Sequence, residues 1–561
     1  MSTQEYLISP KASLLGLPFE LREQIYLEYF TVDGGYVYDG DSCKLVQANN
    51  QPIDLSLRYA CRAIAHETGQ YPFTLNAITF STLYRQDWRK QAIWADYIMD
   101  HHTSFQDAML FRLKRRITPE MYEDPDLKYS QYIPAIRKDL ARSMASWDRS
   151  RDRVPDDSED SEDSRAFKTL RELRSKPATS GGWWGSTVIS QSGTDKTIFF
   201  SRAADCLLRR VAEKDPREFS QAIGEILPGW TDSHSVSEFF NLTFDPWTIP
   251  SEDEVKDKLE ELQLSSLWET SDRWYQLKEK LPGYTGPEFR YRQKIRLSAA
   301  AVAIKFLGQI SRQQRLCISN LILNEDRNSI SSSECHVLGL IPFFRENSKL
   351  IVEHRLNLWR YILPKSVGLG CFEFALDDQG LDLQGWDDIP QTHQARTYEI
   401  AEGVTNIIMH ISKALTEGLP SRSYSLTIEG DPDLNHSTEF FSTAMKPYIV
   451  WLTAHSDCVA QGLLLPPEHC NYPFDTRNSS KETTILRSNF TLDQPWNYDQ
   501  IIEDNEYGII GRPLESITSC YGGFEPKIVD VSTDKLDWME IKRENFLREE
   551  VPKDATGETA A

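Results

Sequence analysis

The chain has 561 residues, of which 40% are hydrophobic and 11% aromatic, and its 62 basic and 84 acidic side chains leave a net charge of −22. A single hydrophobic core stops growing near roughly 250 to 300 residues, so this length predicts two or more compact units with sizeable cores. The negative charge argues against nucleic-acid partners, and the longest apolar stretch, residues 299–307, is shorter than the roughly 20 residues of a membrane helix.

We predict an α+β fold organised in five segments. Residues 1–83 should form a small helical module with a hairpin, and residues 84–146 a helical extension of it. Residues 147–182 should form an acidic and Gly/Ser-rich linker, because residues 149–165 have seven acidic side chains and almost no apolar ones. A larger mixed α/β body rich in helices is expected over residues 183–545, and a disordered tail over residues 546–561.

The first predicted element is a helix in LPFELREQIYLEYF, where apolar side chains recur every four residues at Leu21, Ile25 and Tyr29. Tyr26 and Phe30 extend this apolar face, and the charged residues between them are expected to point outward. Paired glycines and alternating tyrosines then predict a β-hairpin. The stretch PIDLSLRYACRAIAHET predicts a second helix, and FTLNAITFSTL predicts a strand.

After the acidic segment, Ser251 and Glu254 form a capping-box pattern that predicts a helix start. Pro287 is expected to open another helix, and the continuous apolar stripe of residues 398–415 predicts a third. The stretches NLIL and YSLTIE read as strands. Because these two strands are about a hundred residues apart, far more than the period of a leucine-rich solenoid, we find no sequence repeat.

Local signatures of catalysis or cofactor binding are missing. The sequence contains no GxSxG or HExxH, and the glycines Gly368 and Gly370 lack the third glycine of a dinucleotide loop. Alternating oxygen ligands at Asp431, Asp433 and Asn435 suggest a calcium loop, but the required Gly and Glu are absent, so we predict a turn and a helix cap. We therefore expect no cofactor and assign no catalytic residue.

One group of possible zinc ligands is present, at His455, Cys458, His469 and Cys470. Adjacent His469 and Cys470 cannot easily place both side chains on one tetrahedral ion, so we favour loop and core residues over a metal site. Zinc analysis of the purified protein would decide between the two. The widely spread cysteines and the absence of a signal-like N-terminus predict a reducing compartment, the cytosol or the nucleus.

A short basic stretch near the predicted helix start at Pro287 allows two interpretations. It consists of Arg290, Arg292, Lys294 and Arg296. A solvated helix face is the simpler one, and docking of the acidic linker or of an acidic partner is the other.

Three motifs carry a resemblance to a known family. LPFELREQI resembles the opening of an F-box, L-P-x-E-L followed by an isoleucine-bearing helix, and CRAIAHET resembles the later V-C-R element. The combination of LPxELRxxIY, CRxIxxE and FxxNxxxF more closely resembles uncharacterised fungal proteins described as F-box-like. The similarity extends to residues 321–360. Pro18 and Cys61 are 43 residues apart (61 minus 18), a longer separation than in an F-box.

F-box helices bind the small adaptor subunit of cullin-RING ubiquitin ligases through exposed apolar side chains. The resemblance therefore implies a partner-binding surface at Leu17, Pro18, Leu21 and Ile25. An amphipathic helix that packs these side chains against its own domain explains the same pattern.

We accordingly expect a non-enzymatic protein-interaction protein. Its first module would bind the ligase adaptor, and its body would recognise an unknown target protein. An intracellular enzyme whose site is assembled from residues distant in sequence is the first alternative. A structural scaffold is the second.

Overall fold

The computed structural model describes residues 13–122, a few positions between 129 and 141, 198–264, 274–367 except 280 and 282, 370–381, 393–461, 485–492 and 527–551. The expected linker of residues 147–182 lies outside this part of the chain. The described residues form both helices and strands, and the strands pair in parallel and in antiparallel orientation. This confirms the α+β class.

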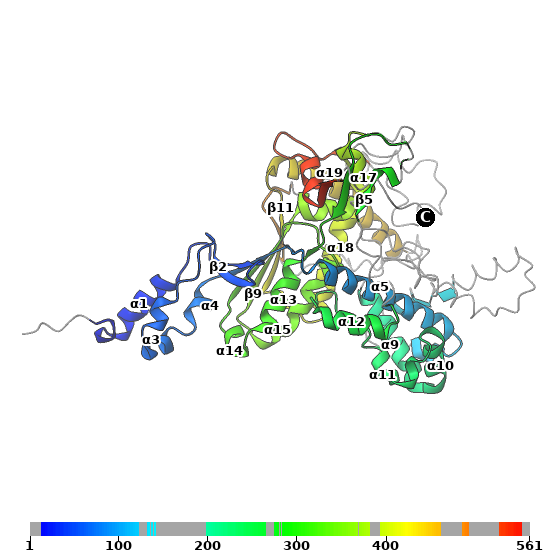
Figure 1. Cartoon of the computed structure of the whole chain (residues 1–561), viewed down its shortest axis with the longest axis horizontal. Helices are drawn as coiled ribbons and strands as arrows, with labels where there is room; N and C mark the ends of the chain where they lie inside the picture. The colour runs from blue at the N-terminus through cyan, green and yellow to red at the C-terminus, as the bar shows by residue number, and fades with distance from the viewer. Residues whose placement is uncertain are drawn as a thin grey trace, which may run out of the picture.

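A seven-stranded sheet forms the centre of the molecule (Figure 1). Its spatial order is β12-β11-β9-β8-β3-β1-β2, and every neighbouring pair is parallel except β1 and β2. Apart from the hairpin strand β2, the strands therefore follow one another in chain order across the sheet. Their bounds are β1 Tyr36–Asp39, β2 Lys44–Gln47, β3 Ile78–Ser81, β8 Asn320–Glu325, β9 Ile351–Asn357, β11 Tyr424–Glu429 and β12 Leu486–Ser488.

One face of this sheet is buried and the other is partly open. Along β8, β9 and β11 the burial alternates residue by residue, as expected for a sheet covered on one side. On the buried face Phe80 of β3 packs against Phe306 of α13, with ring centroids 5.5 Å apart. The helical segments in and beside this layer are α13 Ala299–Gln309, α14 Arg312–Arg315, η6 Ser333–Leu340, α15 Ile341–Glu346, η7 Leu358–Ile362, α16 Leu363–Val367, α18 Thr397–Thr416 and α19 Leu434–Ala460.

A second group of helices packs beside this layer. The long helix α5 contacts α9, α10 and α12, and their apolar side chains belong to the same core as the sheet. Residues 84–122 therefore join the body instead of extending the N-terminal module. The helices are α5 Arg89–Arg112, α6 Pro119–Tyr122, α9 Ile198–Lys214, α10 Pro216–Ile226, α11 Val236–Phe239 and α12 Glu252–Glu261.

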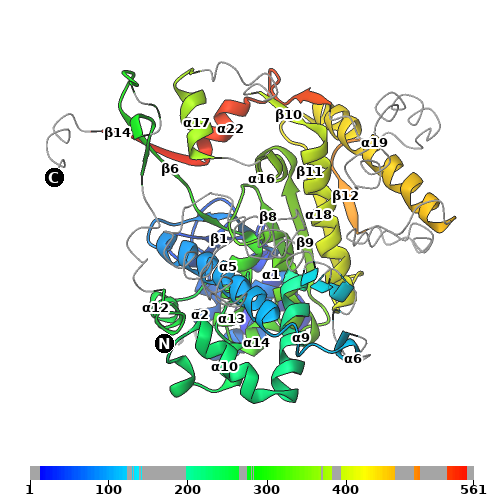
Figure 2. The same ribbon diagram turned by 90° about the vertical axis from the view of Figure 1, so that its right-hand side faces the viewer.

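Three small sheets complete the described part. They pair β4 Leu83–Tyr84 with β7 Arg296–Leu297, β10 Gln394–Arg396 with β13 Ile528–Asp530, and β14 Phe546–Glu550 with β6 Phe289–Gln293, which also pairs with β5 Tyr275–Gln276. Figure 2 shows β6 and β14 beside α17 Cys371–Asp378 and α22 Trp538–Glu544 at one end of the molecule.

The structure differs from the expected segments in two further places. The tail was expected from residue 546, but residues 546–550 form β14, because this strand pairs along its whole length with β6. The helix expected from Pro287 begins only after Ser298, whose side chain accepts a hydrogen bond from the Ala301 amide, and the residues before it form β6 and β7.

The N-terminal module consists of α1 Phe19–Phe30, α2 Ser56–Tyr59, α3 Arg62–Glu67 and α4 Tyr71–Leu75. It extends as an arm from one end of the long axis (Figure 1). The expected second helix is divided into α2 and α3, with Cys61 in extended conformation at the break. The helices at Glu252 and Thr397 and the strands β8 and β11 confirm the corresponding predictions.

Candidate functional site

Residues of two of the three sequence motifs bind one another inside the arm. Arg22 of α1 donates two hydrogen bonds to the Glu67 carboxylate of α3, at 3.0 and 2.6 Å. The hydroxyl of Tyr26 donates to the same carboxylate at 2.8 Å. These hydrogen bonds lower the pKa of Glu67, and those from Arg22 have the largest effect. LPxELRxxIY and CRxIxxE are thus two halves of one folded unit, with Ile64 of the second motif in a small core beside Phe30.

The third motif, FxxNxxxF, links this unit to the sheet through Asn76. Its side chain is 2% exposed. The amide nitrogen donates to the carbonyls of Phe30 at 2.7 Å and Pro72 at 3.0 Å, and the amide oxygen accepts from the backbone N–H of Val32 at 2.8 Å. One residue therefore satisfies backbone groups at the end of α1, in α4, and at the approach to β1.

The four residues expected to bind a partner lie together on the opposite, outer side of α1. Pro18 precedes the first turn and is exposed. The exposed fractions of Leu17, Leu21 and Ile25 are 37%, 46% and 41%. These side chains are outside the small core of the arm and are partly exposed, whereas Arg22, expected to point outward, turns inward to Glu67.

The exposure of large apolar side chains is concentrated on this arm. In the described part of the chain, eight of the fourteen exposed large hydrophobic residues belong to it: Leu15, Leu17, Phe19, Leu21, Ile25, Leu27, Tyr29 and Tyr59. Exposed apolar groups scattered over a surface are normal, but a concentration of them marks an interaction surface. Within this set Leu17, Leu21 and Ile25 are spaced by four residues, and we call these three, with Pro18, the outer face of α1.

The hairpin between the motifs attaches the arm to the body. Tyr36 of β1 donates its amide hydrogen to the carbonyl of Ala77 at 2.9 Å, and β1 pairs in parallel with β3. Gly35 has a φ of +69°, and a Cβ on it would lie 2.5 Å from the Ala77 oxygen. Only glycine fits this position, which explains one of the paired glycines. The boundary expected at residue 83 thus runs through a continuous sheet.

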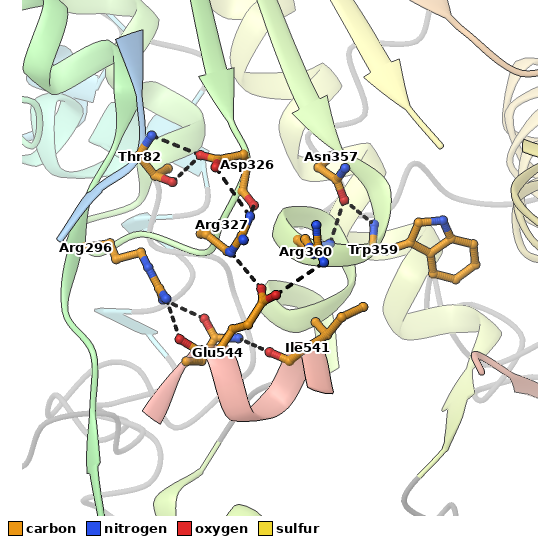
Figure 3. A network of polar contacts seen from close by, with 10 residues as sticks. Thr82, Arg296, Asp326, Arg327, Asn357, Trp359, Arg360, Ile541 and Glu544 are labelled. Atoms are coloured by element: carbon orange, nitrogen blue, oxygen red, sulfur yellow. Dashed lines mark hydrogen bonds and ion pairs between the residues drawn. The ribbon is translucent and has the colours of Figure 1, made fainter. Parts of the chain in front are cut away.

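A polar network lies at the carboxyl ends of three neighbouring strands (Figure 3). After β3, the amide and hydroxyl of Thr82 donate to Asp326, which follows β8. Arg327, just after β8, and Arg360, in η7 after β9, both reach the carboxylate of Glu544 on α22, at 2.8 and 3.2 Å. Carboxyl ends of parallel strands are where open α/β sheets bind ligands.

The basic stretch predicted at a helix start is divided between two places. Arg296 joins the network, donating to Asn545 Oδ1 at 2.8 Å and to the Glu544 carbonyl at 2.5 Å. Arg290 instead stacks on Trp274 and pairs with Glu549 at the small β14–β6 sheet. The prediction of one solvated helix face is wrong, because β6 and β7 occupy this stretch. Arg327, Arg360 and Glu544 were not predicted, and their only signal is that two of them follow strands.

A buried pair, Ser298 and His336, has the spacing of a nucleophile and its base. The Ser298 hydroxyl lies 2.6 Å from His336 Nδ1. Both residues are buried, however, and Ser298 also caps α13. The other ring nitrogen of His336 contacts the carbonyl of Ser331 at 2.6 Å, not a carboxylate. Burial lowers the pKa of His336 to about 4. The arrangement stabilises the helix start and offers no access to a substrate.

The other candidate sites from the sequence are the calcium-like loop, the glycine pair and the possible zinc ligands. Asp433 accepts a hydrogen bond from the His436 amide in the first turn of α19, which confirms the predicted turn and cap. Gly370 precedes α17, and Gly368 lies outside the described residues. His469 and Cys470 also lie outside, and the side chains of their partners on α19 are not described. Among the described residues, no group of three His, Cys, Asp or Glu could hold a metal, and no helix is apolar over a bilayer-spanning length.

Comparisons with known proteins return no relative. The chain matches no protein-family model, no curated protein and no solved structure.

Proposed function

We propose that the chain is a non-enzymatic substrate adaptor of a cullin-RING ubiquitin ligase, acting in the cytosol or nucleus. In this proposal Leu17, Pro18, Leu21 and Ile25 bind the small adaptor subunit, and the body recognises a target protein. The observation that carries it is the outer face of α1. The inner side of the same helix is fixed by Arg22 and Tyr26, so the exposed apolar side chains belong to an ordered helix.

The physical basis is the burial of apolar surface on binding. Complete burial of a leucine or isoleucine side chain is worth about 1.5–3 kcal/mol, and side chains at the centre of an interface contribute most of the affinity. Leu21 and Ile25 are more than one-third exposed in the free chain and can bury that area against a partner. The attachment of the arm to the sheet would then hold the body in a fixed orientation to the ligase.

The test measures binding of the full chain to purified adaptor subunit by isothermal titration calorimetry. The double variant Leu21→Asp with Ile25→Asp should weaken binding by on the order of 100-fold, since two buried apolar contacts are lost. The matched control is Leu316→Asp with Ile351→Asp, two apolar residues of the body that are 39% and 52% exposed. This control should bind like the wild type. Absence of wild-type binding, or equal binding by both double variants, would contradict the proposal.

A further inference from the structure

We propose that Arg327 and Arg360 form a binding site for the carboxylates of an acidic segment in a partner protein, and that the side chain of Glu544 occupies this site in the free chain. The site lies on the body. It does not depend on docking by the N-terminal arm.

The two guanidinium groups are held in place by neighbouring strands. Arg327 follows β8 and Arg360 belongs to η7 directly after β9, so the parallel pairing of the two strands brings both groups to the same edge. Their contacts to Glu544 are divided between its two oxygens, with Arg327 Nε on Oε2 and Arg360 Nη2 on Oε1. Paired arginines of this kind are suited to recognise a planar carboxylate.

Helix α22 is anchored without the Glu544 carboxylate. Within α22, Lys542 forms an ion pair with Asp377 at 2.6 Å, and Trp538 and Ile541 are buried in the core. Arg296 holds the helix end through the backbone carbonyl of Glu544, not its side chain. The Glu544 side chain is 24% exposed, and its buried Oε2 accepts no hydrogen bond among the described residues although it lies 2.8 Å from Arg327 Nε, so the site holds this carboxylate imperfectly.

The local charge favours a further acidic group. Among the described residues, four cations, Lys294, Arg296, Arg327 and Arg360, lie near two carboxylates, those of Asp326 and Glu544. Burial and then the charge of Arg327 lower the pKa of Arg296 to about 10, and burial and Arg296 lower that of Lys294.

One observation shows that the cations are not fully compensated. The buried Nε of Arg360 has no hydrogen-bond partner among the described residues. An incoming carboxylate would therefore meet a net positive charge at this site, although the chain as a whole has a net charge of −22 and repels acidic ligands.

The experiment measures fluorescence anisotropy of a labelled oligo-glutamate peptide with the full chain, against an oligo-glutamine peptide of the same length. Glu544→Gln removes the internal competitor and should tighten glutamate-peptide binding by about tenfold relative to wild type. Adding Arg360→Gln to this variant should abolish the gain. The matched control is Glu549→Gln. Glu549 lies on the same C-terminal segment as Glu544 and forms a comparable ion pair with Arg290 of β6, so its loss should leave binding unchanged.

Two results would overturn the proposal. In one, Glu544→Gln binds the peptide no more tightly than wild type, so that the ion pairs serve only to hold α22. In the other, the Arg360→Gln variant keeps the gain, so that the acidic contact lies elsewhere. If the arginine variant does not fold, the comparison of Glu544→Gln with Glu549→Gln decides alone, because neither change removes an anchor of α22 described above.

Discussion

Replacing Asn76 by alanine should loosen the N-terminal arm and leave the body intact. The side chain makes three hydrogen bonds to backbone groups of α1, α4 and the approach to β1, and it is buried. Each such bond contributes about 0.5–1.5 kcal/mol net, and a buried group left without a partner costs about 1–3 kcal/mol. We therefore expect the local opening free energy of the arm to fall by about 3 kcal/mol.

Hydrogen exchange at the Val32 amide measures this loss directly, because that amide donates to Asn76 Oδ1. A loss of about 3 kcal/mol corresponds to exchange faster by about two orders of magnitude. Amides of α13 in the body should keep their rates. The matched control is Asn49→Ala, an exposed asparagine whose side chain accepts one hydrogen bond from the Gln51 amide. Unchanged exchange at Val32, or equal acceleration in α13, would refute the reasoning.

Two further predictions concern the buried polar groups of the body. Lys365→Met should lower the free energy of unfolding by about 1–3 kcal/mol in urea denaturation, because Glu334, which lies 2.5 Å from the ammonium group and is only 14% exposed, would lose its ion-pair partner. Equal stability of the variant would show that this pair is dispensable. The second change is His336→Gln. Because burial lowers the folded-state pKa of His336 to about 4, the unfolded chain binds more protons between pH 6.5 and 4, so wild type should lose about 2 kcal/mol between pH 7 and pH 5 through this group. The variant should show a smaller loss in denaturation at the two pH values, and an identical slope would contradict the assignment.

The sequence was sufficient where a pattern is local and periodic. The apolar stripe of α18 and the alternation of β11 depend on neighbouring residues only, and both elements form where they were expected. The helix predicted from Pro287 was wrong because these residues form β6, which is stabilised by pairing with β14, more than 250 residues away. The residues of β6 themselves do not reveal this pairing. The start of α13 was displaced for the same reason.

The candidate sites also differ in whether a local sequence pattern or only the tertiary structure reveals them. The resemblance to an F-box helix selected Leu21 and Ile25, and both are exposed on α1; their binding to a partner stays a prediction. The bond between Arg22 and Glu67 joins residues 45 positions apart, and spacing within one helix cannot indicate it. Arg327, Arg360 and Glu544 come from three separate segments. Only the order of strands in the sheet, which follows the chain, brings the first two together.

The hairpin β1–β2 affects how the arm can be removed. Because β3 lies between β1 and β8, cutting the chain after residue 83 would delete three strands from one side of the sheet. Strand β8, with its apolar Leu321 and Leu323, would become a bare edge able to pair with other molecules. A shortened chain that failed to bind a ligase or a target could then have aggregated instead of having lost a docking site. Surface substitutions on α1 in the full chain avoid this ambiguity.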